Sequence, residues 1–254
     1  MITIKSPAEI ASMKKAAAIL VKTYQAVTPF IKSGVTTAKL DQIIRRTIEQ
    51  HGATASFLGY GGFPAASCIS VNDTLIHGIP SEEEVLKEGD LVSLDIGVYY
   101  EGLHVDAARS YGINPSEEAM HLMHTARESF FAAIPFCREG YRIGDISHAV
   151  ETRVRRDNYG VVEGFTGHGV GRALHEGPAI PNYGSPGKGA RLRAGMTLAI
   201  EPMITQGRAD VHVLDDGWTV KTVDGKLAAH YENTVLITDG EPVVLTLSDE
   251  VNDG

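Results

Sequence analysis

Apolar residues recur at helical spacing in two pairs of segments, one pair in each half of the chain. The first pair begins at Ser6-Pro7-Ala8-Glu9, which has the spacing of a capping box with proline at the first helical position. The pattern predicts a long helix over about residues 7–28 and a second helix that ends at Gly52. The second pair begins at Asn114-Pro115-Ser116-Glu117 and predicts a long helix to about residue 137 and a shorter one to residue 160.

Both halves share one order of elements: long helix, glycine break, shorter helix, then strands. An offset of 106 residues superposes Gly34 on Gly140 and Leu40 on Ile146. We interpret this order as a diverged internal duplication within a single catalytic domain of residues 1–254, with pseudo-symmetric halves of about 1–112 and 113–254. A binding site would lie naturally where the two halves meet.

Residues 91–111, LVSLDIGVYYEGLHVDAARSY, have the composition of a β-hairpin that carries one aspartate on each strand. If Tyr100-Glu101 is the turn, Asp95 lies opposite Asp106, and if Glu101-Gly102 is the turn, the two aspartates are diagonal neighbours. Both registers place the side chains on one face, with Cβ atoms roughly 5–8 Å apart. Two like charges should destabilise such an apolar strand pair unless a cation lies between them.

Shorter strands and loops carry the other chemically interesting residues. Residues 57–64 form a glycine-rich aromatic loop, and CISVNDTLIHGIP predicts a strand, a turn and a strand that ends near His77. His168 lies between glycines in FTGHGVG, and Glu201 follows the apolar strand MTLAI. Glu232 begins the last strong strand, and Trp218, the single tryptophan, lies in DDGWTVKT, a predicted hairpin.

Composition and charge exclude several classes of function. The formal net charge of −9 argues against a general affinity for nucleic acids or anionic membranes, and no apolar run is long enough to span a bilayer. Cys68 and Cys137 give no disulfide framework. The N-terminus has no secretory hydrophobic segment, because lysines and a glutamate interrupt it. We therefore expect a cytoplasmic protein.

Five residues are candidate metal ligands: Asp95, Asp106, His168, Glu201 and Glu232. Each acid lies within or beside an apolar strand, where an ionised carboxylate is costly unless it is paired or bound to metal. Basic residues are scarce in these segments, apart from Arg109, which could pair with one acid. Four carboxylates would neutralise two divalent cations, and oxygen ligands with one imidazole suit Mn, Co, Fe or Zn in a hydrolytic site.

Each of these positions also has an ordinary structural interpretation. A single acid at a strand end is usually a turn or edge residue, and a glycine-flanked histidine such as His168 is usually a turn residue. Cys68 on an apolar strand would belong to the core, and Trp218 beside a turn would be a packing anchor. Taken singly, His77, His175 and Tyr60 are weak signals.

Seen together, the motifs resemble one family across nearly the whole chain. The matching segments are NDTLIHGIP, SLDIG, HVDAARS, TGHGVG with Arg172 and His175-Glu176, AIEP with Met203, DGWTVKT and YENTVLIT. They resemble the type I methionine aminopeptidases in their short bacterial form. The resemblance implies the pita-bread fold, an α+β fold of two pseudo-symmetric halves with an antiparallel sheet core and helices on the outer face.

The resemblance also implies roles for residues at matching positions. The five candidate ligands would bind two divalent ions (Co, Mn, Fe or Zn), bridged by Asp106 and Glu232, and a structural monovalent cation is a further expected cofactor. A metal-activated water would attack the first peptide bond, Glu201 would shuttle the proton, and His77 and His175 would contact the substrate. The pocket for the methionine side chain would be lined by Tyr60, Phe63, Cys68, Phe57, Leu174 and Trp218.

The implied activity is removal of the initiator methionine from nascent proteins and peptides with a small second residue. The protein would act as a monomer with transient ribosome contact. One alternative is a related aminopeptidase with altered N-terminal specificity, including action on Xaa-Pro bonds. Another is a relative that binds peptides without catalysis, although such relatives typically lose metal ligands and this chain keeps all five.

Several positions depart from the family pattern and affect the expected specificity. Val105 replaces a usual glycine beside Asp106, and Asn233 replaces a usual histidine after Glu232. In the pocket, Phe57 stands where a smaller residue is usual, Gly61 replaces a common histidine, and Leu174 replaces a frequent phenylalanine. We hypothesise that Phe57 narrows the pocket or its mouth while Gly61 and Leu174 partly make room.

Overall fold

The hairpin predicted near residues 91–111 forms the centre of the fold. In the computed structural model, which describes residues 1–247, β4 (Leu91–Tyr100) pairs with β5 (Leu103–Gly112) along the full length of both strands. Glu101 and Gly102 form the two-residue turn, with φ angles of 49° and 85°. Positive φ at both positions is what a type I′ hairpin turn requires, and glycine adopts it readily.

The register of this hairpin settles how its two aspartates are related. Asp95 lies opposite Ala108 and Asp106 lies opposite Gly97, so the second of the two sequence-derived registers is the one formed. The aspartates are diagonal neighbours on the same face. Val105 is fully buried in an uninterrupted part of the ladder, so the valine at this position leaves the pairing regular.

The strands of residues 1–247 form four antiparallel sheets, and the hairpin belongs to the first of them. The first sheet adds β1 (Thr54–Ala55) and β2 (Ser67–Val71) on the other side of β4. A five-stranded sheet has the spatial order β15 (Val243–Val244), β14 (Asn233–Leu236), β9 (Thr197–Ile200), β7 (Thr166–Gly169) and β8 (Glu176–Pro181). One three-stranded sheet has the order β13 (Ala228–His230), β10 (Met203–Thr205) and β6 (Gly160–Val161). The other has the order β11 (Val211–Val213), β12 (Val220–Thr222) and β3 (Thr74–Ile76).

The helices form at the predicted places. They are α1 (Pro7–Val27), α2 (Thr37–Gln50), α3 (Glu117–Ala133) and α4 (Ile143–Arg156), with short 3₁₀ turns η1 (Thr28–Phe30), η2 (Tyr60–Gly62) and η3 (Ile134–Phe136). Ser6 and Glu9 form the predicted capping box of α1. Ser116 caps α3, since its side chain accepts a hydrogen bond from the backbone N–H of Ala119. No helix among the described residues has the length and apolar content needed to cross a membrane.

The order of elements in the two halves supports the proposed duplication. The offset of 106 residues carries η1 onto η3, α2 onto α4 and β1 onto β6 without any shift of their bounds. The same offset carries Asp95 onto Glu201, so two of the candidate ligands occupy equivalent places. We therefore propose that residues 1–112 and 113–254 derive from one ancestral unit.

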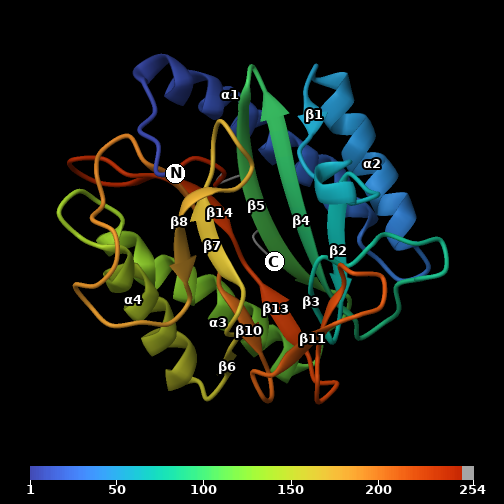
Figure 1. Cartoon of the computed structure of the whole chain (residues 1–254). Coiled ribbons are helices and arrows are strands. Elements are labelled where there is room, and N and C mark those ends of the chain that lie inside the picture. The colour runs from blue at the N-terminus through green and yellow to red at the C-terminus, as the bar shows by residue number, and fades with distance from the viewer. Residues whose placement is uncertain (248–254) are drawn as a thin grey trace.

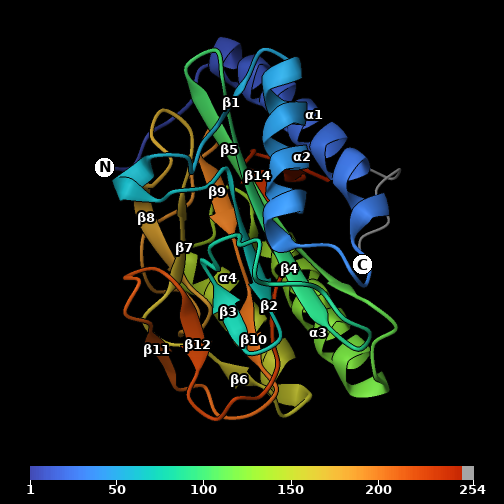
Figure 2. The same ribbon diagram turned by 90° about the vertical axis from the view of Figure 1, so that its right-hand side faces the viewer.

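The helices cover one side of the sheets, and the apolar core lies between the two layers. Helices α1 and α2 pack against the sheet of β4, while α3 and α4 pack against β6, β8, β10 and β13. Figure 2 shows α1, α2 and α3 on one side of the molecule and β7, β8, β11 and β12 on the other, and Figure 1 shows the green β4–β5 hairpin between the two halves. The helix-free side of the sheets is therefore left for the functional site.

Candidate metal centre and pocket

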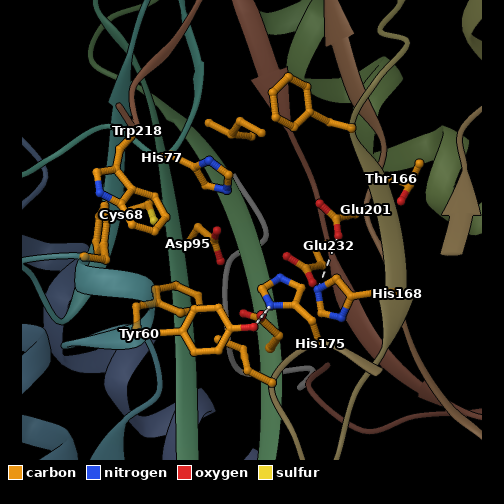
Figure 3. Close-up of a pocket in the computed structure, with 16 residues that line it drawn as sticks. Tyr60, Cys68, His77, Asp95, Thr166, His168, His175, Glu201, Trp218 and Glu232 are labelled. Carbon is orange, nitrogen blue, oxygen red and sulfur yellow. Dashed lines mark hydrogen bonds and ion pairs between the residues drawn. The ribbon is translucent and has the colours of Figure 1, made fainter. Parts of the chain in front are cut away.

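The structure brings all five predicted metal ligands into the lining of one cavity of about 180 Å³. They come from different parts of the fold: Asp95 from β4, Asp106 from β5, His168 from β7, Glu201 directly after β9, and Glu232 between β13 and β14. Figure 3 shows His168, Glu201 and Glu232 on one side of the cavity with Asp95 facing them. Residues separated by more than a hundred positions in sequence thus share a single site.

The side chains lie close enough to share metal ions. One ligand atom each from Asp106, His168 and Glu232 lies within 4.8 Å of the others. His168 Nε2 is 3.6 Å from Glu201 Oε1. A second group with the same spacing contains Asp95, Glu232 and a residue absent from the predicted ligands, His230.

Without bound metal ions, burial makes the ionised forms of these acids energetically unfavourable. It raises the pKa of Asp95 to about 7, and together with the neighbouring carboxylates it raises the pKa values of Asp106, Glu201 and Glu232 well above their usual range. Asp95 Oδ1, Asp106 Oδ1 and Glu232 Oε1 are buried without a hydrogen-bond partner in the part of the chain that the structure describes. Such buried acceptors and like charges fit a donor set for divalent cations, which would supply the missing partners.

His168 is oriented as a metal ligand requires. It lies within strand β7, not in the turn that its flanking glycines would ordinarily indicate. Its Nδ1–H donates to the backbone carbonyl of Gly169 at 2.9 Å, which fixes the tautomer and leaves the Nε2 lone pair facing the acids. Burial lowers the pKa of His168 to about 4, so the ring is neutral at physiological pH.

Arg109 contacts the backbone behind the acid cluster. Its buried guanidinium donates to the backbone carbonyl of Glu232 and, at 2.7 Å, to Asn233 Oδ1. It also stacks on Tyr231, with 4.7 Å between Cζ and the ring centroid. Its charge lowers the pKa of Glu232, but less than burial raises it. Asn233 Oδ1 also accepts from Thr246 Oγ1, so this asparagine holds Arg109 in place behind the site.

The other side of the cavity is apolar. The buried side chains that pack together here are Phe57, Phe63, Ala65, Cys68 and Leu174, with Trp218 and Ile79 against them. Cys68 lies on β2 directly opposite Asp95, so the wall and the acid cluster share a strand pair. Trp218 meets Phe63 edge to face, with 5.2 Å between the ring centroids. Cys68 and Trp218 therefore pack in an apolar cluster and also line the cavity, where a wall containing sulfur and aromatic rings suits an unbranched thioether.

The three pocket residues that depart from the family pattern are Phe57, Gly61 and Leu174, and the structure shows what each of them contacts. Phe57 lines the cavity, and a Cβ at Gly97 would lie 2.8 Å from its ring. A Cβ at Gly61 would lie 3.1 Å from the Trp218 ring, so the space left by this glycine is taken by Trp218. Leu174 is buried in the same wall. The bulk of Phe57 is thus accommodated beside Gly97.

Two further histidines line the cavity from opposite sides. His175 packs on His168, with ring centroids 4.1 Å apart, and its Nδ1 is 2.8 Å from the Tyr60 hydroxyl (Figure 3). His77 has an unusual φ of 57° and lies edge to face with Trp218 and Phe165. Burial lowers the pKa of His77 to about 4 and also lowers that of His175. Both rings are therefore neutral and offer one N–H donor each.

The sequence interpretation missed four residues at this site. Ile76, Phe165 and Thr166 line the cavity, and His230 joins the candidate ligands. One signal for His230 was available, because residues two apart on a strand share a face and His230 precedes Glu232 by two. Phe165 and Thr166 carried no comparable signal, since only the long-range pairing of β7 brings them to the site.

Comparison with known proteins agrees with this architecture. The model of "Metallopeptidase family M24" matches residues 11–239. A methionine aminopeptidase of Clostridium perfringens is 50% identical over 248 residues, covering 97% of this chain and 99% of that one. The solved methionine aminopeptidase of Thermotoga maritima is 43% identical with a TM-score of 0.95, covering 98% of this chain and all of that one. The prolidase of Pyrococcus furiosus shares the fold with a TM-score of 0.79 at 23% identity, and this chain covers 66% of it.

The fold and the acid-rich site thus define a metallopeptidase of the pita-bread class. The chain belongs to metallopeptidase family M24, within its type I methionine aminopeptidases. The predicted fold class is confirmed by these matches and by the antiparallel sheets and outer helices described above.

Proposed function

We propose that this protein removes the N-terminal methionine from nascent proteins and peptides that have a small second residue. The observation that carries the proposal is the junction of two surfaces in one cavity. Four carboxyl groups, three of them with a buried oxygen that has no hydrogen-bond partner among the described residues, meet an apolar wall containing Cys68 and Trp218. At about 180 Å³ the cavity is smaller than the ~300–1,000 Å³ typical of small-molecule sites, which suits one side chain and its α-amine.

We assign the metal centre to Asp95, Asp106, His168, Glu201 and Glu232, which would together hold two divalent ions. Ions of Co, Mn, Fe or Zn held there would supply Lewis-acid activation of water and of the scissile carbonyl. The free α-amine of a substrate would lie against the same acidic cluster, which explains action at the chain terminus only. A structural monovalent cation remains an expectation from the family.

The chain's own residues move the protons. Glu201 accepts a proton from the attacking water and passes it to the leaving amine. His175, as a neutral ring, accepts a hydrogen bond from the Tyr60 hydroxyl at Nδ1 and so presents Nε2–H to the developing oxyanion. His77, on the opposite wall, contacts the substrate backbone.

The cellular setting follows from the substrate. Initiator methionine is exposed on chains leaving the ribosome, so we place the protein in the cytoplasm, with transient contact to the ribosome. Both cysteines are buried free thiols, which agrees with a reducing compartment. The site is complete within one chain, so we expect a monomer to be active.

The test is hydrolysis of Met-Ala-Ser by metal-stripped protein, with Co²⁺, Mn²⁺, Fe²⁺ or Zn²⁺ added back in turn. Peptides that begin with Leu, Phe or Xaa-Pro are run beside it, and Met-Ile-Ser tests the second residue. We expect metal-dependent release of methionine from Met-Ala-Ser and little or none from the other peptides.

Two results would contradict the proposal. Faster release from the Xaa-Pro peptide would assign the protein to the prolidase-like specificity. Failure to cleave any peptide with any metal, despite measurable metal binding, would assign it to the non-catalytic relatives.

A further inference from the structure

His230 is a buried histidine whose position no ordinary core role explains. It ends strand β13, pairs with Met203 of β10, and is 2% exposed. Its Nε2 lies 3.7 Å from Glu201 Oε2 and 3.7 Å from Glu232 Oε2. That nitrogen has no hydrogen-bond partner within the described residues. A buried core histidine normally has both ring nitrogens satisfied, so an orphaned Nε2 aimed at two carboxylates indicates a missing ligand.

The histidine also completes a symmetry in the site. The described residues contain two groups with metal-ligand spacing, Asp106–His168–Glu232 and Asp95–His230–Glu232, and each group has its atoms within 4.8 Å of one another. Each group contains one imidazole and two carboxylates, and Glu232 belongs to both. Two ions that share Glu232 would therefore each have one nitrogen donor available.

The donor atoms around His230 also fit this role. The unsatisfied oxygens of Asp95 and Glu232 lie in the same group and also require a cation. Nitrogen, with these oxygens, gives a mixed donor set that favours Fe²⁺, Co²⁺ and Zn²⁺ over Mn²⁺ and Mg²⁺.

We propose that His230 is a ligand of the second divalent ion, the one held by Asp95, so that both ions of the centre have an imidazole ligand. This inference rests on the dinuclear centre of the proposed function. It adds a nitrogen ligand to the five predicted ligands. With this ligand the second site binds its metal ion more tightly, and selects among divalent metals more strongly, than carboxylates alone would allow.

The experiment titrates metal-stripped protein with Co²⁺ and follows binding by calorimetry and by visible absorption. The His230→Gln variant keeps a polar side chain of similar reach, and His168→Gln is the matched variant for the first ion. We expect His230→Gln to weaken binding of one of the two Co²⁺ ions by at least about tenfold and to leave the other within twofold. We expect the preference of that second site for Co²⁺ over Mn²⁺ to shrink in the same variant.

Proton NMR of the dicobalt protein gives a readout that does not depend on affinity or activity. Each cobalt-bound imidazole contributes one exchangeable, hyperfine-shifted N–H signal. The wild type should show two such signals, and His230→Gln and His168→Gln should each lose a different one. His104→Gln, which changes a histidine bonded to Ser56 outside both groups, should keep both signals and so controls for general effects of substitution.

The outcomes distinguish the role of His230 from the existence of the dinuclear centre. If the wild type binds two Co²⁺ ions and His230→Gln binds both with unchanged affinity and an unchanged NMR spectrum, the role of His230 is refuted and the dinuclear centre stands. If the wild type binds fewer than two ions, the dinuclear centre itself is refuted. Circular dichroism of each metal-free variant verifies that the fold is retained.

Discussion

Phe57 is the pocket residue whose bulk most directly limits what the cavity admits. Its ring is buried in the apolar wall with Phe63 and Leu174, and the absence of a side chain at Gly97 leaves room for it. The sequence showed that Phe57 was large for its position, but only the fold shows that Gly97, from the central hairpin, accommodates it.

Shortening this residue should widen the specificity of the enzyme. For Phe57→Cys we expect kcat/KM on Leu-Ala-Ser to rise by at least about tenfold, because a few added methylenes of space are worth that much discrimination. Release from Met-Ala-Ser should change less. Leu58→Ala, at the exposed neighbouring position, is the control and should leave the ratio unaltered. An unchanged preference in Phe57→Cys would show that the ring does not set the size limit.

Residue-level prediction from sequence reached the four acids, together with His168, because buried charge in apolar strands demands an explanation. It missed His230, since a histidine at a strand end has many ordinary interpretations and its orphaned Nε2 is visible only in three dimensions. Arg109 was expected to be able to pair with an acid of the site. Among its described contacts are the Glu232 backbone carbonyl and the Asn233 side chain.

At the scale of elements, the N-terminal segment holds the loop that carries His175. Lys5 is buried and forms an ion pair with Glu176 at 2.6 Å. Glu176 also accepts hydrogen bonds from the backbone N–H groups of Arg172 and Ala173, closing the loop on itself. Because His175 directly precedes Glu176, this buried pair fixes where the histidine can point.

Breaking the pair should therefore affect both stability and catalysis. For Lys5→Ala we expect a loss of about 3–5 kcal/mol in the free energy of unfolding, the usual cost of leaving one buried charge unpaired. We also expect a lower kcat at a nearly unchanged KM, because His175 acts on the transition state. Chemical denaturation and steady-state kinetics measure the two effects.

Lys15→Ala provides the matched control. Lys15 pairs with Glu101 at 3.0 Å, but both side chains are largely exposed, and such surface pairs contribute little to stability because water screens the charges. If Lys5→Ala were no more harmful than Lys15→Ala, the anchoring role of the N-terminal segment would be wrong.

Helices and the central hairpin could be predicted from the sequence because their signals lie within short, continuous segments of the chain. Caps and apolar spacing located all four helices, and glycine at the second turn position favoured the hairpin register that forms. The pairing of β7 with β8 and β9 could not be predicted, because it joins short segments through side-chain packing and backbone hydrogen bonds that no local pattern encodes.

At the scale of the whole molecule, the acid cluster makes the metal-free fold sensitive to pH. Burial raises the pKa of Asp95 from 3.8 to about 7, and those of Asp106, Glu201 and Glu232 are also raised. A raised carboxyl pKa contributes stability at low pH that is lost as the pH rises through the folded-state value. The depressed pKa of buried histidines such as His168 acts in the opposite sense, but that contribution is complete above about pH 6.5.

The Tm of the metal-free protein should therefore fall as the pH rises above 6.5, through the raised pKa values of the acids. Metal-loaded protein should show a much flatter profile, since the bound cations replace the protons. Asp106→Asn, which removes one of the coupled acids, should reduce the slope of the metal-free curve. Scanning calorimetry across this pH range measures all three, and a metal-free Tm that rose with pH would contradict the assigned burial of charge.

The central claim is that the buried acids bind two metal ions that drive release of N-terminal methionine. The most direct test measures methionine release from Met-Ala-Ser against equivalents of Co²⁺ added to metal-stripped protein, at a protein concentration far above the dissociation constants. We predict no activity without metal and a rise that reaches its plateau by two equivalents. Full activity in the stripped protein, or none at saturation with bound Co²⁺, would contradict the account.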